Sequence, residues 1–535
     1  MRGRLTSLVV LAGAIAAGLV FEAGEADDPV EPETTVVAGV AMPTARPEPT
    51  LSSTWFCAGG TARDGGSADH VVLIANPTDE ARTATITVLT GQVAPAPPLP
   101  EDEADAEGGE DASTTTTSST TTTSTTEAPP TTVPAPTVEQ IEVPAWDRVE
   151  VRLGDLVDAQ LAAAIVEVDG GDVAVEHQVS GDLGRATAPC SSTAAPAWSI
   201  PWGVTTRGNR ELLVFMNPFP DDATVDIAFA TDEGVRDTAR FQGFVVPGRS
   251  VVGAFIDQDV TRKSQVSAQV TVRGGRLVVD RIQLFDGTDG RRGMTLGLGV
   301  PAPAETWVFP AGETGEGLFE QVVVFNPTEE VAEVEVEVRL DEWDEELGPP
   351  EPFELTVPPG RFALLDLQSE ERIPAGAGHS IFVRSLNGVP VTAERVNAAG
   401  DPAENEGITS VTGAPYGAPT WYLVAGGPST EDERDEILVI LNLDDEQEVT
   451  YDLIGFDSGQ TIAVQGQQDQ SIPPGGRVVV RLGDHLDRDE LAVVVRATGP
   501  VVVERGLHRI GGLGLSQALG IPLGTDLVVP TPGGL

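Results

Sequence analysis

Lysine is almost absent from the sequence, and basic residues as a class are scarce. Lys263 is the single lysine, and 32 basic residues stand against 83 acidic ones, which gives a formal charge of −51. A chain of this charge has no basic stripe that could neutralise a phosphate backbone, so nucleic acid is excluded as a partner. The surplus carboxylates predict a solvated acidic surface that gathers Ca²⁺ only weakly.

Cysteine and histidine are also scarce, with two and five residues respectively. Two cysteines cannot complete a four-ligand zinc site, and the histidines show no H-x-x-x-H spacing. We therefore expect no metal and no cofactor. Cys57 and Cys190 are disulfide candidates, because a cysteine pair in an exported protein is more often bridged than free.

Aromatic residues make up only 5% of the chain, whereas its 59 glycines and 42 prolines approach a fifth of all residues. This composition suits many short strands joined by turns and argues against long helices. A chain of 535 residues is also too long for one core. We expect about three to five domains.

The longest uncharged run lies at the N-terminus. Arg2 and Arg4 precede an uncharged segment from Leu5 to Phe21. This order is typical of an export signal over residues 1–26. The run is about as long as the shortest membrane-spanning helices, so it predicts either a cleaved signal peptide or a retained N-terminal anchor helix. In both cases the remainder, beginning with a linker at 27–50, lies outside the cytoplasm.

One unit of sequence occurs four times after this segment. VVLIANPTD, LLVFMNPFP, VVVFNPTEE and ILVILNLDD each place an asparagine after an apolar run, and a tryptophan precedes each asparagine by 19 or 21 residues. So constant a spacing indicates an internal repeat. The tryptophans are Trp55, Trp198, Trp307 and Trp421, and the asparagines are Asn76, Asn217, Asn326 and Asn442. We interpret the tryptophans as core residues and the asparagines as strand terminators, because asparagine can bond its own backbone to begin a turn.

Two further polar positions recur in every unit. An arginine follows a proline turn, and a carboxylate with a basic neighbour lies close to the end of a later apolar run. We expect the two to pair within one unit, as Arg361 with Glu394, and to serve structure and not chemistry. The arginines are Arg148, Arg249, Arg361 and Arg477, and the carboxylates are Glu176, Asp280, Glu394 and Glu504.

Within a unit the hydrophobic period is two. In VAEVEVEVRL, residues 331–340, valines alternate with charged residues, so one face is buried and the other meets water. The sequence predicts an all-β protein of four tandem Ig-like antiparallel β-sandwich units. Closure of the repeated blocks into a propeller is the rival arrangement. The ending GIPLGTDLVVP is expected to finish the fourth unit and not to pair with the first.

The predicted units cover residues 51–193, 194–302, 303–416 and 417–535. The first is longer because it holds an insert at 91–137, with an acidic run and fourteen consecutive serines and threonines. Such a segment has little to bury and is expected to be a disordered spacer. O-linked sugars on it are the alternative.

Catalytic motifs are not evident. Gly514–Ala518 resembles the GxSxG turn of serine hydrolases, but Ser516 aligns with threonines on ordinary strands of other units, and no helix follows. We therefore predict no catalytic residue. Trp146, Trp202 and Trp343 lie outside the repeat pattern and are the better candidates for ligand contact if any exists.

With these elements in place, the chain resembles a family of exported bacterial proteins, common in high-GC Gram-positive bacteria, that is defined only as a domain of unknown function. The features that carry the resemblance are WFCAGG at 55–60, the run LLVFMNPFPDDATVDIAF, VVPGR, and VVDRIQLFDG ahead of GMTLGLGVPAP. The resemblance covers almost everything after the signal. It implies export, an N-terminal membrane segment and no assigned activity.

We therefore expect a non-enzymatic, extracytoplasmic, envelope-associated scaffold or binding protein. A cell-wall carbohydrate-binding protein is the first alternative, and an enzyme with an unrecognised active site is the second. The expected partners are an envelope protein or a cell-wall glycan, together with the membrane if the N-terminal segment is retained.

Overall fold

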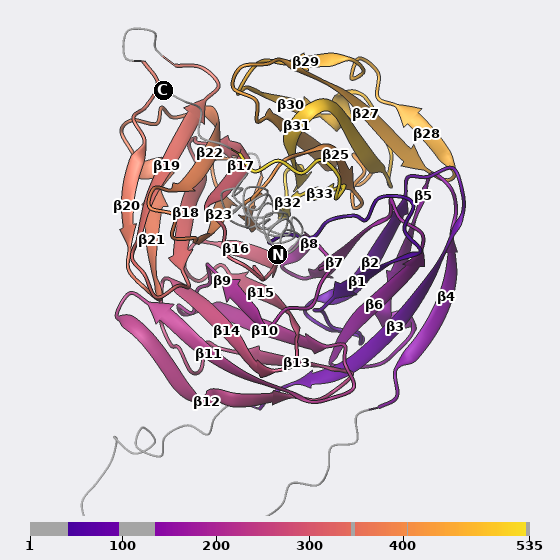
Figure 1. The fold of residues 1–535 in the computed structure, drawn as a ribbon, viewed down its shortest axis with the longest axis vertical. Helices are drawn as coiled ribbons and strands as arrows, with labels where there is room; N and C mark the ends of the chain where they lie inside the picture. Colours follow the sequence, from indigo (N-terminus) through magenta and orange to yellow (C-terminus); the bar gives the residue numbers. More distant parts are fainter. Residues whose placement is uncertain (1–40, 96–133, 344–347, 404, 531–535) are drawn as a thin grey trace, which may run out of the picture. The chain divides into compact units, whose positions relative to one another are not determined.

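The structure is a computed structural model that describes residues 41–95, 134–343, 348–403 and 405–530, and this part of the chain is all-β (Figure 1). The all-β part of the predicted fold class is thereby confirmed. The predicted signal or anchor lies outside the described residues, as does most of the insert, although Gly91–Val93 continue a strand. In the described part of the chain, no helix has the length and apolar character needed to cross a membrane.

The strands fall into four consecutive sets, here called units 1 to 4. Unit 1 holds β1 (Ser52–Cys57), β2 (Asp69–Asn76), β3 (Arg82–Val93), β4 (Thr137–Val143), β5 (Asp147–Arg152), β6 (Leu161–Asp169), β7 (Ala174–Gly181) and β8 (Gly184–Pro189). Unit 2 holds β9 (Ala197–Ile200), β10 (Asn209–Asn217), β11 (Ala223–Thr231), β12 (Gly234–Val246), β13 (Ser250–Phe255), β14 (Val266–Gly274), β15 (Val278–Asp286) and β16 (Arg292–Leu298). Unit 3 holds β17 (Thr306–Glu313), β18 (Leu318–Asn326), β19 (Ala332–Leu340), β20 (Phe353–Val357), β21 (Arg361–Asp366), β22 (Gly378–Ser385), β23 (Thr392–Ala399) and β24 (Gly407–Thr412). Unit 4 holds β25 (Ala418–Leu423), β26 (Arg434–Asn442), β27 (Val449–Asp457), β28 (Gln460–Ala463), β29 (Gln470–Ile472), β30 (Arg477–Arg481), β31 (Ala492–Arg509), β32 (Leu515–Leu519) and β33 (Ile521–Pro522).

All four units share one topology. In units 1 to 3 the first, sixth, third and fourth strands form one antiparallel sheet, and the fifth, second, seventh and eighth form another, as in β17-β22-β19-β20 and β21-β18-β23-β24. In unit 4 the long strand β31 takes the sixth place with its first half and the seventh with its second half. The repeat in the sequence is therefore a repeat of structure, built from pairs of sheets whose strand order differs from the ABED and CFG order of immunoglobulin domains.

The core of each unit lies between its two sheets, as the period of two predicts. Along β19 the valines Val334, Val336 and Val338 are buried, while the charged residues between them reach solvent. The repeat tryptophans are at most 1% exposed. Trp307 donates its Nε1–H to Val391 O at 2.8 Å, and Trp198 and Trp421 make equivalent bonds inside their own units. Their expected role in the core is confirmed.

The recurring asparagine does more than end a strand. Asn326 accepts a hydrogen bond from Thr328 N at 2.9 Å, which makes the expected turn, and it donates to Glu330 O and to Val357 O at 2.6 and 2.8 Å. Val357 ends β20, which belongs to the opposite sheet. Each repeat asparagine makes the same pair of donations, so this side chain ties the two sheets of every unit together.

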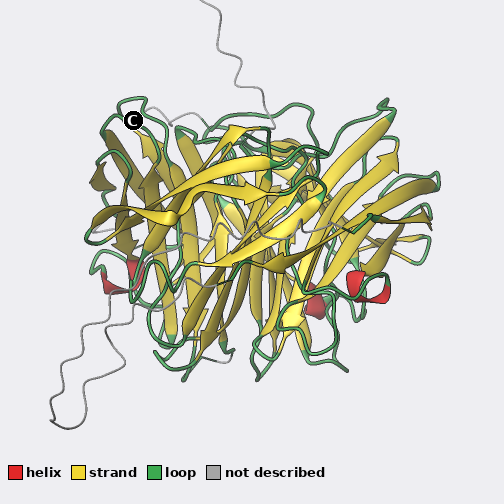
Figure 2. Cartoon of the chain, turned by 90° about the horizontal axis from the view of Figure 1, so that it is seen from below, coloured by secondary structure: helices red, strands yellow, loops and turns green. Residues whose placement is uncertain are grey.

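The units close on one another. The eighth strands contact in a cycle in which β8 lies against β16, β16 against β24, β24 against β32, and β32 against β8. Figure 1 labels β8, β16 and β32 near its centre. The described residues accordingly form one compact body. The blocks thus close into a ring, as in the propeller alternative, but each block is a pair of sheets. Short 3₁₀ turns follow β5, β21 and β30. They are drawn in red in Figure 2, where they lie in the lower half of the molecule.

Units 1 and 2 also share a sheet. Residues Gly91–Val93 of β3 run parallel to Val251–Gly253 of β13. A Cβ atom on Gly91 would lie 1.6 Å from Val251 O, so only glycine permits this approach. The contact therefore depends on one position at the edge of the predicted insert.

Both ends of the described chain meet in unit 4. Ile521 of β33 pairs with Tyr422 of β25, so the ending finishes the fourth unit, as predicted. Ala45 lies beside it, because Ala45 N donates to Pro522 O at 2.9 Å and Gly524 N donates to Ala45 O at 2.8 Å. Part of the predicted linker at 27–50 is therefore packed against the ring.

The two-sheet role of the asparagine gives a first prediction. The substitution Asn326→Ala should lower the free energy of unfolding by about 2 kcal/mol, because the buried Val357 carbonyl loses its partner. Urea denaturation measures this loss. Pro327→Ala is the matched control and should cost clearly less, since unit 4 has Leu443 at that place. Equal effects of the two substitutions would contradict the cross-sheet role.

Candidate functional site

The recurring carboxylates lie on the seventh strands and pair with the neighbouring unit. Arg281 of unit 2 binds Glu394 of unit 3 through two hydrogen bonds of 2.6 and 3.0 Å. Arg505 of unit 4 binds Glu176 of unit 1 at 2.9 Å. Arg395 of unit 3 binds Glu504 of unit 4 in the same way. All of these side chains are buried, so these contacts are buried joints between successive units.

The predicted pairing of Arg361 with Glu394 inside one unit is therefore wrong. Consecutive residues of a strand point to opposite faces, so the carboxylate and its basic neighbour on β23 address different units. The turn arginines also reach the preceding unit: Arg361 donates to Asp232 O, and Arg477 binds Asp341 at 2.7 Å. Arg148 likewise donates to Val424 O at 3.3 Å. For Arg249 the structure shows a left-handed backbone with a φ of 53°.

A second carboxylate faces each buried arginine from its own unit. It lies on the second strand, six residues before the repeat asparagine, and it is Glu211, Glu320 or Glu436. Burial raises the pKa of Glu211 to about 8 and that of Glu436 to about 7, although Arg281 and Arg505 oppose the shift. Glu211 is thus mostly protonated at neutral pH. Sequence reasoning missed these residues, although their constant distance from the asparagine was a usable signal.

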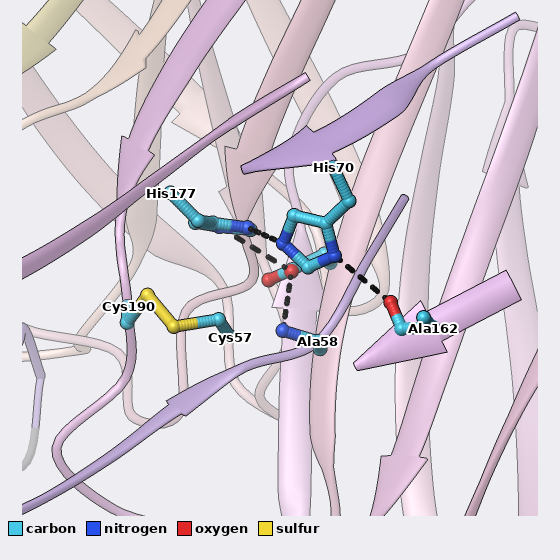
Figure 3. Close-up of a disulfide and its surroundings, with 7 residues drawn as sticks. Cys57, Ala58, His70, Ala162, His177 and Cys190 are labelled. Atoms are coloured by element: carbon cyan, nitrogen blue, oxygen red, sulfur yellow. Dashed lines mark hydrogen bonds and ion pairs between the residues drawn. A yellow bond between two sulfur atoms is a disulfide. The ribbon is translucent and has the colours of Figure 1, made fainter. Parts of the chain in front are cut away.

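The joint between units 1 and 2 has different chemistry. His70 replaces the second-strand glutamate and His177 replaces the arginine (Figure 3). His70 Nδ1 lies 2.9 Å from Ala162 O, and its Nε2 lies 3.1 Å from His177 Nδ1. His177 Nε2 lies 3.6 Å from Asp280 Oδ2, which accepts a hydrogen bond of 3.1 Å from Ala58 N.

These three groups are uncharged at neutral pH. Burial lowers the pKa of His70 to about 4 and holds the pKa of His177 well below its usual value. Burial also raises the pKa of Asp280 to about 8, against the opposing hydrogen bond from Ala58 N. The first joint therefore lacks the ion pair of the others. Because all three side chains are fully buried, a substrate cannot reach them in this conformation.

A disulfide lies beside this joint. Cys57 on β1 and Cys190 after β8 are bridged, with their Cα atoms 4.7 Å apart (Figure 3). At the equivalent place in unit 2, Ile200 packs against Gly299. The disulfide therefore takes the place of an apolar contact and links the first strand of unit 1 to the end of its last strand.

A cleft of about 650 Å³ lies between unit 4 and unit 1. Strands β5, β7 and β8 supply one wall, and β26, β31, β32 and the segment Ala425–Gly427 supply the other. Arg185 and Arg509 lie in opposite walls. Ser516 also lines the cleft, and its Oγ accepts a hydrogen bond from Thr187 N at 3.0 Å. The sequence indicated neither the cleft nor Arg185.

The tryptophans outside the repeat differ in exposure. Trp202 is 1% exposed and belongs to a hydrophobic cluster between units 2 and 3, so it cannot contact a ligand there. Trp343 is 51% exposed, and Trp146 packs edge-on against Phe456. Among the described residues, no group of three or more histidine, cysteine, aspartate or glutamate side chains is arranged to hold a metal ion.

Comparison with known proteins adds little about chemistry. A family model described as a family of unknown function (DUF5719) matches residues 174–285, which run from β7 to β15 and so span one period of the repeat. No curated protein matches the chain. The solved structures include the crystal structure of Thermotoga maritima 1070, which is 21% identical over 21% of this chain and 94% of that chain, with a TM-score of 0.18.

The buried joints give a second prediction. Arg281→Met should lower the free energy of unfolding by about 3 to 5 kcal/mol, because Glu394 is left charged and buried. The double variant Arg281→Met/Glu394→Met should recover much of this loss. The control is Arg273→Met, which removes an exposed pair with Asp226 of similar 2.6 Å geometry and should change stability far less. Urea unfolding compares the three, and a double variant as unstable as the single one would contradict the pairing.

The first joint gives a third prediction, for pH. Folding lowers the pKa of His70 from 6.5 to about 4, so the unfolded chain binds more protons between these values. Above about pH 6.5, His70 is neutral in both the folded and the unfolded chain, and stability is at its full value. As the pH falls from 6.5 toward 4, only the unfolded chain takes up the proton, so the free energy of unfolding decreases. Relative to wild type, His70→Gln should gain stability over that range.

The urea midpoint of both proteins, measured across this pH range, tests the point. Asp280 changes stability with the opposite sign, because its pKa is raised to about 8 and its protonation therefore increases the free energy of unfolding as the pH falls. Asp280 is present in both proteins, so its effect cancels in the difference. His485→Gln, outside the joints, is the control. A difference between His70→Gln and wild type that does not change with pH would contradict the neutral joint.

Proposed function

We propose that the protein is a non-enzymatic, extracytoplasmic scaffold or binding protein associated with the cell envelope. The observation that carries this proposal is the closed set of four units, in which buried polar joints fix each unit against the next. A buried charge without its partner is strongly unfavourable, so such joints favour one rigid arrangement. A rigid body with an acidic surface is suited to holding or presenting other molecules. It is less suited to catalysis that requires closure around a substrate.

The location outside the cytoplasm rests on two features of unlike kind. The uncharged run from Leu5 to Phe21 has the order of an export signal. The Cys57–Cys190 disulfide is buried, and such bonds persist mainly in oxidising compartments. We further propose that the N-terminal run serves as a signal or anchor helix.

The units themselves are best explained as copies of one module. We propose four tandem sandwich units that share the general architecture of Ig-like domains but have their own strand order, within the exported bacterial family that the sequence resembles. The identical strand order and the fourfold asparagine bridge support duplication.

Cell-wall carbohydrate binding is the second candidate function. The cleft between units 4 and 1 favours it, because its lining is rich in arginine, carboxylate, amide and hydroxyl groups that can bind sugar hydroxyls. Purified peptidoglycan or arabinogalactan should then retain the full chain. Absence of retention would remove this candidate and leave the scaffold role.

The location gives a fourth prediction. Protein purified from its native cells should carry the disulfide, so Cys57 and Cys190 should react with an alkylating reagent in denaturant only after reduction. Mass spectrometry of the intact chain measures this. The same chain made in a reducing cytoplasm without residues 1–26 is the control. Two free thiols in the native protein would contradict export.

Fractionation of the same cells tests the envelope association separately. The protein should sediment with envelope membranes or wall material and should be cleaved by protease added to cells whose membrane is intact. Recovery in the protease-protected soluble fraction would contradict the proposal.

A further inference from the structure

The cleft between units 4 and 1 occupies a place that is filled with hydrophobic side chains elsewhere in the ring. At the corresponding place between units 2 and 3, a buried cluster joins the two units. It contains Trp202, Val204, Phe285, Val323, Val396 and Ile408. This cluster is a conventional apolar contact between packed units.

The equivalent residues at the cleft follow from the repeat register. Trp202 and Ala425 both stand four residues after a repeat tryptophan, and Phe285 and Arg509 both stand five residues after a repeat carboxylate. Ala425 and Arg509 both line the cleft. This wall therefore has an alanine and a guanidinium where the joint between units 2 and 3 has two large aromatic side chains.

The opposite wall has changed in the same direction. Val396 corresponds to Gln178, because both stand two residues after a repeat carboxylate. Ile408 corresponds to Arg185, because the strand pairs Ala398↔Ile408 and Ser180↔Arg185 occupy the same register. Met294 and Leu515 hold this position in the other two units, and both are buried. Arg185 is thus the polar exception in a ring of apolar residues.

The replaced residues have opened space. Ile408 packs against Gly293 of the preceding unit, where a Cβ would lie 3.0 Å from its Cγ2. At the cleft the corresponding glycine is Gly514, and a Cβ placed there would have only Arg509 atoms within 4 Å. Arg185 therefore does not fill the position that Ile408 fills. The volume of about 650 Å³ is suited to a small molecule.

Two of the four arginines that line the cleft are held in ion pairs. Arg148 pairs with Glu150 at 2.9 Å, and Arg434 pairs with Asp432 at 2.9 Å. Within the part of the chain that the structure describes, the side chains of Arg185 and Arg509 have no hydrogen bond or ion pair. Although Arg185 is exposed, partial desolvation in the cleft, followed by the positive charge of Arg434, lowers its pKa against the opposing charges of Glu150 and Asp432. An anion beside Arg185 would relieve that repulsion.

The carboxylates of the cleft already have partners. Besides Glu150 and Asp432, Glu490 lies 3.5 Å from Arg148, Asp435 pairs with Arg481 at 2.6 Å, and Asp489 accepts a hydrogen bond of 2.6 Å from the Ser429 hydroxyl. Their charge remains, however, and it would repel a long polyanion. The cleft therefore suits a compact ligand with one anionic group and several hydroxyls.

We propose that the cleft between units 4 and 1 binds a small polar ligand through one oxyanion, a carboxylate or a phosphate, held by Arg185 and Arg509. Guanidinium groups match both oxyanions because they offer parallel N–H donors. Gln178, Ser180 and Ser516 supply further hydrogen-bonding groups along the same walls. This site goes beyond the scaffold role, which does not depend on it.

Calorimetric titration of the full chain tests the proposal, with inorganic phosphate and glucuronate as the two anionic probes and glucose as the neutral one. Ionic strength is held constant, because surface charge effects change with salt. At least one anion should bind, and glucose should bind much more weakly. Stronger binding of phosphate assigns the site to phosphate groups, and stronger binding of glucuronate assigns it to carboxylates.

Two variants then locate the binding. Arg185→Gln should weaken binding of the better anion by about tenfold or more. The matched control is Arg207→Gln, an exposed arginine of unit 2, which should bind as wild type does. Arg509→Gln, on the opposite wall, gives the same test if Arg185→Gln fails to fold. No binding of either anion, or equal binding by wild type and the cleft variants, would overturn the proposal.

Discussion

The contact on which the ring depends is the buried pair between a carboxylate of one unit and a basic residue of the unit before it. Burying either group alone costs several kcal/mol, whereas the pair is tolerated when its hydrogen bonds are made. Arg281 and Glu394 meet this condition only when units 2 and 3 are both in place. The same arrangement recurs at three of the four joints. An open row running from unit 1 to unit 4 would therefore leave Arg505 unmatched at one end and Glu176 unmatched at the other. Closure of the ring pairs these two groups with each other.

The first joint shows how this constraint can be relaxed. His70 and His177 replace a glutamate and an arginine together, so the change removes both charges and leaves neither unmatched. Asp280 stays neutral beside them. Other links hold the same units: the parallel contact of β3 with β13 joins units 1 and 2, and the disulfide fastens unit 1 to itself. The polar residues at the joints thus differ between units as groups and not one at a time. The residues that line the cleft between units 4 and 1 also differ as a group.

Much of the fold could be read from the sequence, because the period of two and the fourfold spacing are local signals. They predicted the strands, the buried tryptophans and the asparagine turns. They could not identify the partner of Glu394, since the period gives the face of a strand but not which unit lies against it. The cleft was missed for a related reason. It arises from residues that are small or polar where the joint between units 2 and 3 has Trp202 and Ile408, and such differences matter only once the contacting units are known.

The segment at 41–48 has a mechanical consequence. Ala45 is held between Pro522 and Gly524, and Glu48 binds Arg82 and the backbone of Gly171, so this short piece of chain is fastened to units 4 and 1 at once. Backbone hydrogen bonds that lie side by side resist force together when the load runs along the strand. A force applied to the chain ahead of residue 41 would therefore be distributed over units 1 and 4. The ring would resist that force as a whole, and unit 1 would not be pulled away from unit 4.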